Sequence, residues 1–214
     1  MIPAFCANEE SEAAKRINAA ATVMTEIMST SDKAIPQDLL NKAECIGVIP
    51  GLKKGAFIVG GKYGRGFVTC RKSDGVGWGA PASVRIEGGS FGFQIGGAET
   101  DVVMLIMNRS GAEKLTKSRF TLGGDASVAA GPVGRDASAQ TDAMMNAQIL
   151  TYSRQRGVFA GVSLSGATMR EDTSWNQDLY GTAYKNADIL AGKVPATPPT
   201  QPLLTALNKY SSRK

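Results

Sequence analysis

The chain has 214 residues, of which 43% are apolar, and its 24 basic and 19 acidic residues give a formal net charge of +5. This is the composition of an ordinary globular protein, long enough to bury a sizeable core in one domain or in one domain with appendages. The chain contains no histidine, which excludes a Ser-His-Asp triad and removes the commonest general base and the commonest zinc ligand. The mild positive charge favours anionic partners such as phospholipid headgroups or nucleic acid.

The first residues, 1–7, resemble the tail of an export signal whose basic and apolar regions are missing. This predicts an extracytoplasmic protein, periplasmic or secreted and associated with a membrane. A disordered start of a cytoplasmic protein is the alternative. No stretch approaches the ~20 apolar residues that a membrane-spanning helix needs.

Residues Glu9 to Met28 are expected to form an amphipathic helix, because apolar residues recur there at spacings of three and four. The apolar stripe consists of Ala13, Ile17, Ala20, Ala21, Met24, Ile27 and Met28. Two interpretations stay open: the helix docks on its own domain, or it lies on a membrane with Lys15 and Arg16 near lipid phosphates. Glutamates at the front of the helix weaken the second interpretation, because acidic residues repel anionic lipid.

The glycine-rich middle of the chain, residues 47–166, alternates short apolar runs with turn signals. Each run carries β-branched or aromatic side chains and is expected to form a strand. The expected strands are Gly55–Gly61, Gly66–Cys70, Ala82–Glu87, Ser90–Ile95, Asp101–Met107, Gln148–Arg154 and Val158–Leu164. Repeated glycine inside strands implies sharp bends, so we expect an α+β protein with a strongly bent antiparallel sheet or barrel-like body.

Short helices are expected around this sheet. The first follows Pro36, with Leu39, Leu40 and Ala43 facing inwards. The others are expected at Ser110–Lys117, Asp172–Tyr180, Thr182–Leu190 and Leu203–Tyr210. Residues 136–146 are expected to form a surface loop. A proline-rich, semi-rigid linker is predicted after Val194. The chain is thus divided into an N-terminal segment with its helix at 1–30, a main domain at 31–194, and a linker with a basic tail at 195–214.

Cations cluster at the turns of the first predicted strands. Lys53, Lys54, Lys62, Arg65, Arg71 and Lys72 follow one another with an acid only beyond them, at Asp74. If strand pairing brings them to one face, they form a patch for lipid phosphates, each worth about 1 kcal/mol near an anionic surface. As a solvated hairpin edge they need no function.

The three cysteines, Cys6, Cys45 and Cys70, are far apart and include no C-x-x-C pair, which argues against a structural zinc site. Cys45 and Cys70 lie in apolar runs. We expect both to be buried as small hydrophobic side chains rather than joined in a disulfide.

No motif for catalysis, cofactor or metal is recognisable. The stretch from Ala56 to Tyr63 lacks the leading glycine and the Ser or Thr of a phosphate-binding loop. A hydrolase that uses the carboxylates of Glu171, Asp172 and Asp178 is a minor hypothesis, because those residues lie in a polar turn region. Alternating aromatic and basic residues, typical of nucleic-acid binding, are also missing. We therefore expect no enzyme, no metal, no cofactor and no nucleic-acid partner.

Several stretches together resemble the SYLF domain family, which includes the yeast Las17-binding, actin-regulating proteins and many bacterial exported proteins. The matching pieces are residues 35–40 with Ala43, 46–50, 64–66, 78–81, 89–96, 101–104, 130–132, 152–157, 161–166, 180–181 and 189–190. Gly79 departs from the serine that the family usually has after its tryptophan.

The resemblance implies a non-enzymatic module that binds anionic membrane lipids with phosphoinositide-like headgroups. We assign that role to the six cations above, with Lys15 and Arg16 on the helix. In eukaryotic members the family also implies actin binding, so the alternative is a protein-interaction module of actin-regulator type without a lipid role. A protein partner is compatible with either, and the sequence leaves the oligomeric state unknown.

Overall fold

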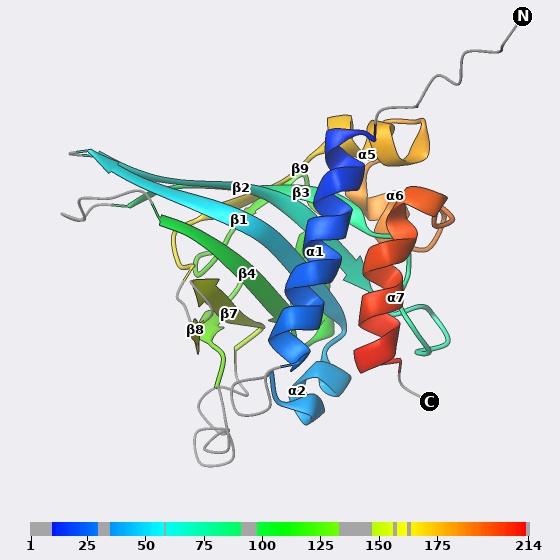
Figure 1. The fold of residues 1–214 in the computed structure, drawn as a ribbon, viewed down its shortest axis with the longest axis horizontal. Helices are drawn as coiled ribbons and strands as arrows, with labels where there is room; N and C mark the ends of the chain where they lie inside the picture. Colours follow the sequence, from blue (N-terminus) through cyan, green and yellow to red (C-terminus); the bar gives the residue numbers. More distant parts are fainter. Residues whose placement is uncertain are drawn as a thin grey trace, which may run out of the picture.

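The computed structural model describes residues 10–29, 35–57, 59–90, 98–132, 147–155, 158–161 and 164–212. Within these ranges the chain folds as the predicted α+β protein, with helices packed on a strongly curled sheet (Figure 1). Three predictions lie wholly or mostly outside the described residues. They are the export-signal remnant at 1–7, the strand at 90–95 and the loop at 136–146.

The described helices and strands follow the predicted order, with three short additional strands. The helices are α1 (Glu12–Ser29), α2 (Gln37–Lys42), α3 (Arg109–Leu115), α5 (Thr173–Tyr180), α6 (Asn186–Leu190), the 3-10 helix η2 (Pro198–Thr200) and α7 (Gln201–Tyr210). The strands are β1 (Cys45–Phe57), β2 (Val59–Cys70), β3 (Ala82–Ser90), β4 (Ala98–Ile106), β5 (Arg119–Thr121), β6 (Val128–Ala130), β7 (Ile149–Gln155), β8 (Val158–Gly161) and β9 (Thr168–Glu171). The strands missing from the prediction are β5, β6 and β9, together with the part of β1 that precedes Gly55.

The described strands form one sheet in the order β5-β9-β3-β2-β1-β4-β7-β6, and β8 also pairs with β7. All neighbours are antiparallel except β6 and β7. The longest strands, β1 and β2, form a hairpin in which Phe57 pairs with Val59. The prediction of a single strand over 55–61 was therefore wrong, because that glycine-rich run contains the point where the chain reverses.

Alternating side chains divide the sheet into two faces. On β4, Val103 and Leu105 belong to one core cluster, and Val102, Met104 and Ile106 belong to the other. We call the first side the outer face; α1, α2, α5 and α7 pack on it. The second, the inner face, is enclosed by the curl of the sheet together with α3 and α6.

Gly66 permits the close approach of β2 to β1 in the curled sheet. A Cβ atom on Gly66 would lie 2.1 Å from the carbonyl oxygen of Val48, so no other residue fits at this close approach. The bent sheet predicted from repeated glycine is confirmed.

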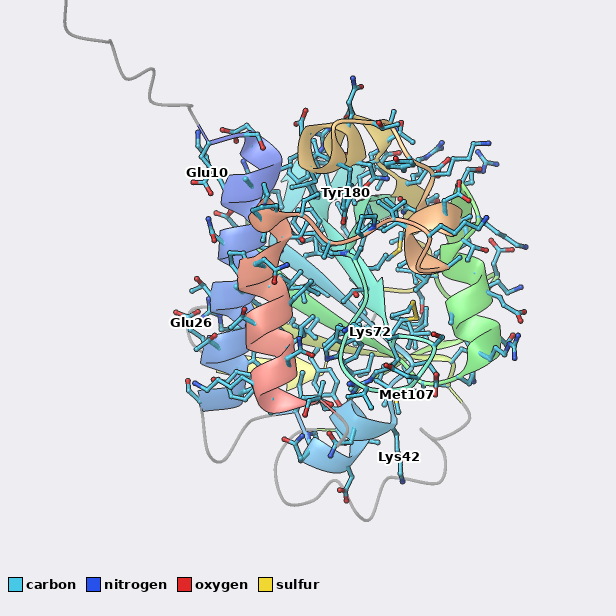
Figure 2. The ribbon with its side chains drawn as sticks, turned by 90° about the vertical axis from the view of Figure 1, so that its right-hand side faces the viewer. Glu10, Glu26, Lys42, Lys72, Met107 and Tyr180 are labelled. Carbon is cyan, nitrogen blue, oxygen red and sulfur yellow. A yellow bond between two sulfur atoms is a disulfide. The ribbon has the colours of Figure 1, made fainter. Side chains whose placement is uncertain are left out.

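The first helix docks on its own domain, as one of the two interpretations predicted. Ala13, Ile17, Ala20 and Met24 are each 0% exposed and face the outer side of the sheet. Helix α7 lies alongside α1 in both views (Figures 1 and 2) and buries Leu203 and Leu207 in the same core. The apolar stripe of α1 is thus used within the fold. No helix in the described ranges combines the length and the apolar content needed to cross a bilayer.

The C-terminal segment is packed as well. The predicted terminal helix is confirmed as α7, and the proline-rich stretch before it includes η2, where Thr200 is fully buried. The division of the chain into three segments stays a prediction.

Cys45 and Cys70 form a disulfide, so the expectation of two separate thiols was wrong. The two residues lie 25 positions apart in the sequence, but the antiparallel register of β1 and β2 places them directly opposite each other. Cys45 is buried as expected, and Cys70 is half-buried.

Candidate functional site

The six predicted lipid-binding cations of β1 and β2 are spread along the length of the hairpin and the loop that follows it. Lys53 and Lys62 lie near the β1–β2 hairpin, whereas Arg71 and Lys72 follow the other end of the strand. Lys62 and Arg71 are nine residue positions apart along extended chain, which corresponds to about 30 Å. The structure therefore does not bring the six cations into one patch. The backbone of Lys54 pairs with Lys62, and its side chain lies outside the described residues.

Arg71 holds the two ends of the domain together. Its guanidinium donates hydrogen bonds to the backbone carbonyls of Leu40, Ala43 and Ser211 and to the Ser211 hydroxyl. It also stacks 3.7 Å from the centre of the Trp78 ring. A guanidinium with this many internal acceptors has little left for a ligand.

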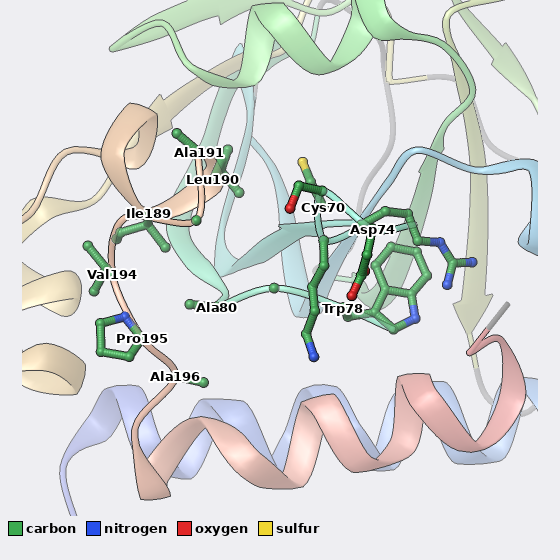
Figure 3. A pocket seen from close by; sticks show the side chains of 15 residues that line it. Cys70, Asp74, Trp78, Ala80, Ile189, Leu190, Ala191, Val194, Pro195 and Ala196 are labelled. Carbon is green, nitrogen blue, oxygen red and sulfur yellow. The ribbon is translucent and has the colours of Figure 1, made fainter. Parts of the chain in front are cut away.

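Lys72 is exposed on the loop that follows β2 (Figure 2). It borders a groove of about 600 Å³. Ile189, Leu190 and Val194 line one side of this groove, and Cys70, Trp78 and Ala80 line the other (Figure 3). The groove also contains Asp74, so its charged groups are of mixed sign and select no anion.

The cations of α1 are engaged with their own domain. Lys15 Nζ lies 3.0 Å from Glu12 Oε1, one turn away on the same helix. Arg16 Nη1 donates a 2.9 Å hydrogen bond to the carbonyl oxygen of Pro50, which fastens α1 to β1.

Arg154 on β7 makes a second connection between α1 and the sheet. Its guanidinium contacts Glu26 of α1 and lies 2.7 Å from Asp101 Oδ2 on β4. Burial lowers the pKa of Arg154, but the hydrogen bond and charge of Asp101, with those of Glu26, outweigh it and raise that pKa above its ordinary value. Asp101 also accepts a hydrogen bond from the backbone N–H of Gly51.

Among the predicted residues, Arg65 belongs to a larger cluster of charged side chains. It lies on the outer face of β2, where its Nε is 3.0 Å from Asp172 Oδ2. Its guanidinium carbon lies 4.7 Å from the centre of the Trp175 ring of α5. Its side chain nevertheless stays 30% exposed, and Asp172 is almost fully buried.

Strand register places three more arginines beside Arg65. Arg65 pairs with Arg85 on β3, Arg85 pairs with Arg170 on β9, and Arg170 pairs with Arg119 on β5. Directly paired residues project from the same side of a sheet, so all four lie on the outer face. Strands are about 4.8 Å apart, so this arginine row (Arg65, Arg85, Arg170 and Arg119) extends over about 14 Å.

The row carries more positive than negative charge. One carboxylate, that of Glu87, contacts two of its members: Oε1 lies 3.0 Å from Arg85 Nε and Oε2 lies 3.1 Å from Arg170 Nε. Asp172 contacts a third. Arg119 is exposed and has no ion pair with any residue that the structure describes. Among the described residues, four guanidinium groups therefore share two carboxylates in ion pairs, which leaves an excess of two positive charges.

These contacts are ion pairs without hydrogen-bond alignment. The Nε atoms of Arg65, Arg85 and Arg170 have no hydrogen-bond partner despite the nearby carboxylates. Their terminal Nη groups likewise donate no hydrogen bond to the described part of the chain. The side chains of Arg85 and Arg170 are 36% and 37% exposed although their Nε atoms are buried, so an external anion reaches these side chains only at their other atoms.

Sequence reasoning missed three of the four arginines. Arg170 and Arg119 lie on β9 and β5, two strands of four and three residues that were not predicted. Alternation around Arg85, between the buried Val84 and Ile86, was the one local signal for an outward-facing cation.

The carboxylates considered for a hydrolase do not converge on one cleft. Glu171 accepts a hydrogen bond from the backbone N–H of Asn186, Asp172 contacts Arg65, and Asp178 is exposed. No cluster of three possible metal-ligating residues occurs within the described ranges.

Comparison with known proteins connects this fold to actin regulation. Residues 87–210 match the model of a family described as "Ysc84: Las17-binding protein actin regulator". SH3 domain-containing YSC84-like protein 1 of Rattus norvegicus is 34% identical over 215 aligned residues, which cover 99% of this chain and 62% of the rat protein. LAS seventeen-binding protein 3 of Saccharomyces cerevisiae is 33% identical over 209 residues, which cover 96% of this chain and 45% of the yeast protein. The chain thus spans about half to two thirds of the length of these relatives.

Proposed function

Because the chain belongs to the Ysc84, or SYLF, family of Las17-binding actin regulators, we propose that it is a non-enzymatic domain that binds an acidic surface of a protein partner. The family match confirms the SYLF resemblance predicted from the sequence. The observation that carries the proposal is the arginine row, an under-compensated set of partly exposed guanidinium groups on the outer face.

The row has the chemistry of a protein-docking surface. Arginine is enriched in protein interfaces, and its planar fork of N–H donors matches carboxylates in pairs. A positive surface also accelerates encounter with a negative one and disfavours basic partners. In the covered half of the outer face the guanidinium of Arg71 is occupied by acceptors of the chain itself.

The names of the relatives supply the first partners to test. They describe Las17 binding and actin regulation, which in this chain are proposals because it spans only part of those proteins. Actin filaments are therefore the first probe.

The test is co-sedimentation of the protein with actin filaments at several salt concentrations. The proposal expects binding that weakens at least about tenfold in the double variant Arg85→Glu/Arg170→Glu, because each reversal replaces attraction by repulsion. The matched control is Lys42→Glu/Lys72→Glu, which changes the net charge equally at exposed positions away from the row. Equal loss in both variants, or binding indifferent to both, would contradict a specific role of the row.

A second candidate function, binding to an anionic membrane surface, has its own supporting observation. Lys53 is exposed near the hairpin end of the sheet and pairs with Tyr63, which is 48% exposed. A cation beside an exposed tyrosine suits the boundary between lipid headgroups and acyl chains. The apolar face of α1 takes no part, because it is buried.

Sedimentation with vesicles that contain anionic lipid separates the two candidates. Lipid binding at the hairpin expects the loss in Lys53→Glu/Lys62→Glu and little change in Arg85→Glu/Arg170→Glu. This candidate is rejected if Arg85→Glu/Arg170→Glu loses vesicle binding while Lys53→Glu/Lys62→Glu keeps it. It is also rejected if the protein sediments with neutral vesicles alone.

The predicted extracytoplasmic location also remains a proposal. The Cys45–Cys70 disulfide supports it, because disulfides persist mainly in oxidising compartments. Alkylation of the protein at the moment of cell lysis tests it: free thiols at both positions speak for a reducing compartment.

A further inference from the structure

Resting on the proposed function, we infer that the arginine row receives one acidic α-helix of the protein partner, lying across β2, β3, β9 and β5 with carboxylates three and four residues apart. The inference concerns the secondary structure and the charge pattern of the partner. It follows from the spacing of the four arginines and from what covers the rest of the outer face.

The spacing of the row matches a helix better than a strand. Its arginines lie about 4.8 Å apart, one on each strand, over about 14 Å. On a helix, residues at i, i+3, i+7 and i+10 share one side and span about 15 Å, with about 5 Å between neighbours. An extended peptide presents side chains on one side only every ~6.7 Å, so three of its acids would meet four arginines. A helical stripe therefore gives one carboxylate to each guanidinium.

The fold already covers its outer face with helices. Helices α1 and α7 pack on the part of that face that belongs mainly to β1, β4 and β7, and α5 packs over β2 and the start of β3. The ring of Trp175 from α5 stacks on Phe67 and borders Arg65, so the helical layer ends at the first arginine of the row. On β3 this layer still covers Ser83, which is fully buried and donates a backbone hydrogen bond to Asn176 of α5. The outer core cluster includes no described residue of β9 or β5, and the side chains of Arg85 and Arg170 stay 36% and 37% exposed. A partner helix continues the layer at this point.

Glu87 competes with the carboxylates of a partner for two arginines of the row. Its single carboxylate contacts both Arg85 and Arg170, and it is itself 38% exposed. When two carboxylates of the partner arrive, each arginine exchanges a shared acid for one of its own. Glu87→Gln is therefore expected to strengthen binding of an acidic helix about two- to fivefold, since it removes both the competing contact and a repulsive charge.

Designed peptides test the inference directly on the full chain. The first is a helical peptide of about 20 residues with glutamates at i, i+3, i+7 and i+10. The second has the same composition and helicity, with its glutamates distributed around the helix. The third is an extended peptide with a glutamate at every second position. Fluorescence anisotropy at low salt is expected to show the striped helix binding at least about tenfold tighter than either control, and this advantage should vanish in Arg85→Gln/Arg170→Gln.

The outcomes separate this inference from the proposed function. Equal affinity for the striped and distributed helices, or tighter binding of the extended peptide, overturns the helix inference even if filaments bind through the row. Filament binding that ignores Arg85→Glu/Arg170→Glu overturns the proposed function. If the striped helix still binds through the row in that case, the surface accepts an acidic helix from some other partner.

Discussion

The outer face of the sheet has a covered half, on β1, β4, β7, the end of β2 and the start of β3, and an open half, from Arg85 of β3 across β9 and β5. Arginines occur in both halves, but they differ in how well their guanidinium groups are paired within the chain. In the covered half Arg71 and Arg154 find several acceptors within the chain and connect elements that are distant in sequence. In the open half the arginine row shares two carboxylates in contacts that lack hydrogen-bond alignment.

The comparison shows that the role of a cation is set by the acceptors around it. Breaking a well-satisfied, buried guanidinium leaves carbonyls and carboxylates unpaired and costs stability. Breaking an exposed ion pair costs little, because water replaces the partner. Substitutions in the covered half should therefore change folding, and those in the open half should change binding.

The largest effect is expected at the open end of the β1–β2 hairpin, where the disulfide joins Cys45 to Cys70. Replacing both by alanine should lower the free energy of unfolding by about 3 kcal/mol, because the bond constrains a loop of 25 residues in the unfolded chain. Urea unfolding of the oxidised protein and the variant measures the difference. Reduced wild-type protein serves as the control and should resemble the variant; equal stability of the oxidised and reduced forms contradicts the expectation.

The next effect contrasts one arginine from each half. Arg71→Met should lower the free energy of unfolding by about 2–3 kcal/mol, because it leaves the carbonyls of Leu40 and Ser211 without their donor. Arg85→Met, the matched change in the open half, should cost about 0.5 kcal/mol or less. Chemical denaturation of both variants checks the pair. Similar losses in the two would remove the distinction between the halves.

A smaller contrast replaces a carboxylate by its amide in each half. Asp101→Asn should cost about 1.5 kcal/mol, because it weakens the charged contact with Arg154 that also holds Glu26 of α1. Glu87→Gln should change the free energy of unfolding by about 0.5 kcal/mol or less. Hydrogen exchange of α1 amides should rise in Asp101→Asn alone. Faster exchange of α1 in both variants argues against a local fastening.

The smallest effect on stability concerns Tyr180, whose buried phenol donates a 2.6 Å hydrogen bond to the carbonyl oxygen of Pro81. Burial raises the pKa of Tyr180 above its ordinary value of about 10. The neutral phenol therefore contributes stability that is complete below pH ~10 and is lost as the pH rises further. Tyr180→Phe should cost about 1 kcal/mol at pH 7 and flatten the alkaline loss seen by thermal unfolding between pH 9 and 11. Tyr63→Phe, in an exposed side chain of the outer face, is the control and should change stability by less than about 0.5 kcal/mol.

Much of the fold follows from local patterns in the chain. The three- and four-residue spacing from Ala13 to Ile27 predicts α1 and the side that it buries, and apolar runs predict the core strands β4 and β7. The strands β5, β6 and β9 escape prediction, because three or four residues are too few to show a period. Because β5 and β9 are so short, Arg119 and Arg170 could not be predicted as cations on the outer face.

Composition and periodicity alone determine that this chain forms a glycine-bent, α+β domain and that it lacks the histidines of common catalytic sites. Only the packed structure decides which cations are free to act. Arg71 looked available because its acceptors, Leu40 and Ser211, lie 31 and 140 residues away in the sequence. Arg85 looked isolated because its paired neighbours, Arg65 and Arg170, lie 20 and 85 residues away. The physical reason is that local patterns depend on neighbours within a few residues, whereas strand register and hydrogen-bond acceptors depend on contacts across the whole chain.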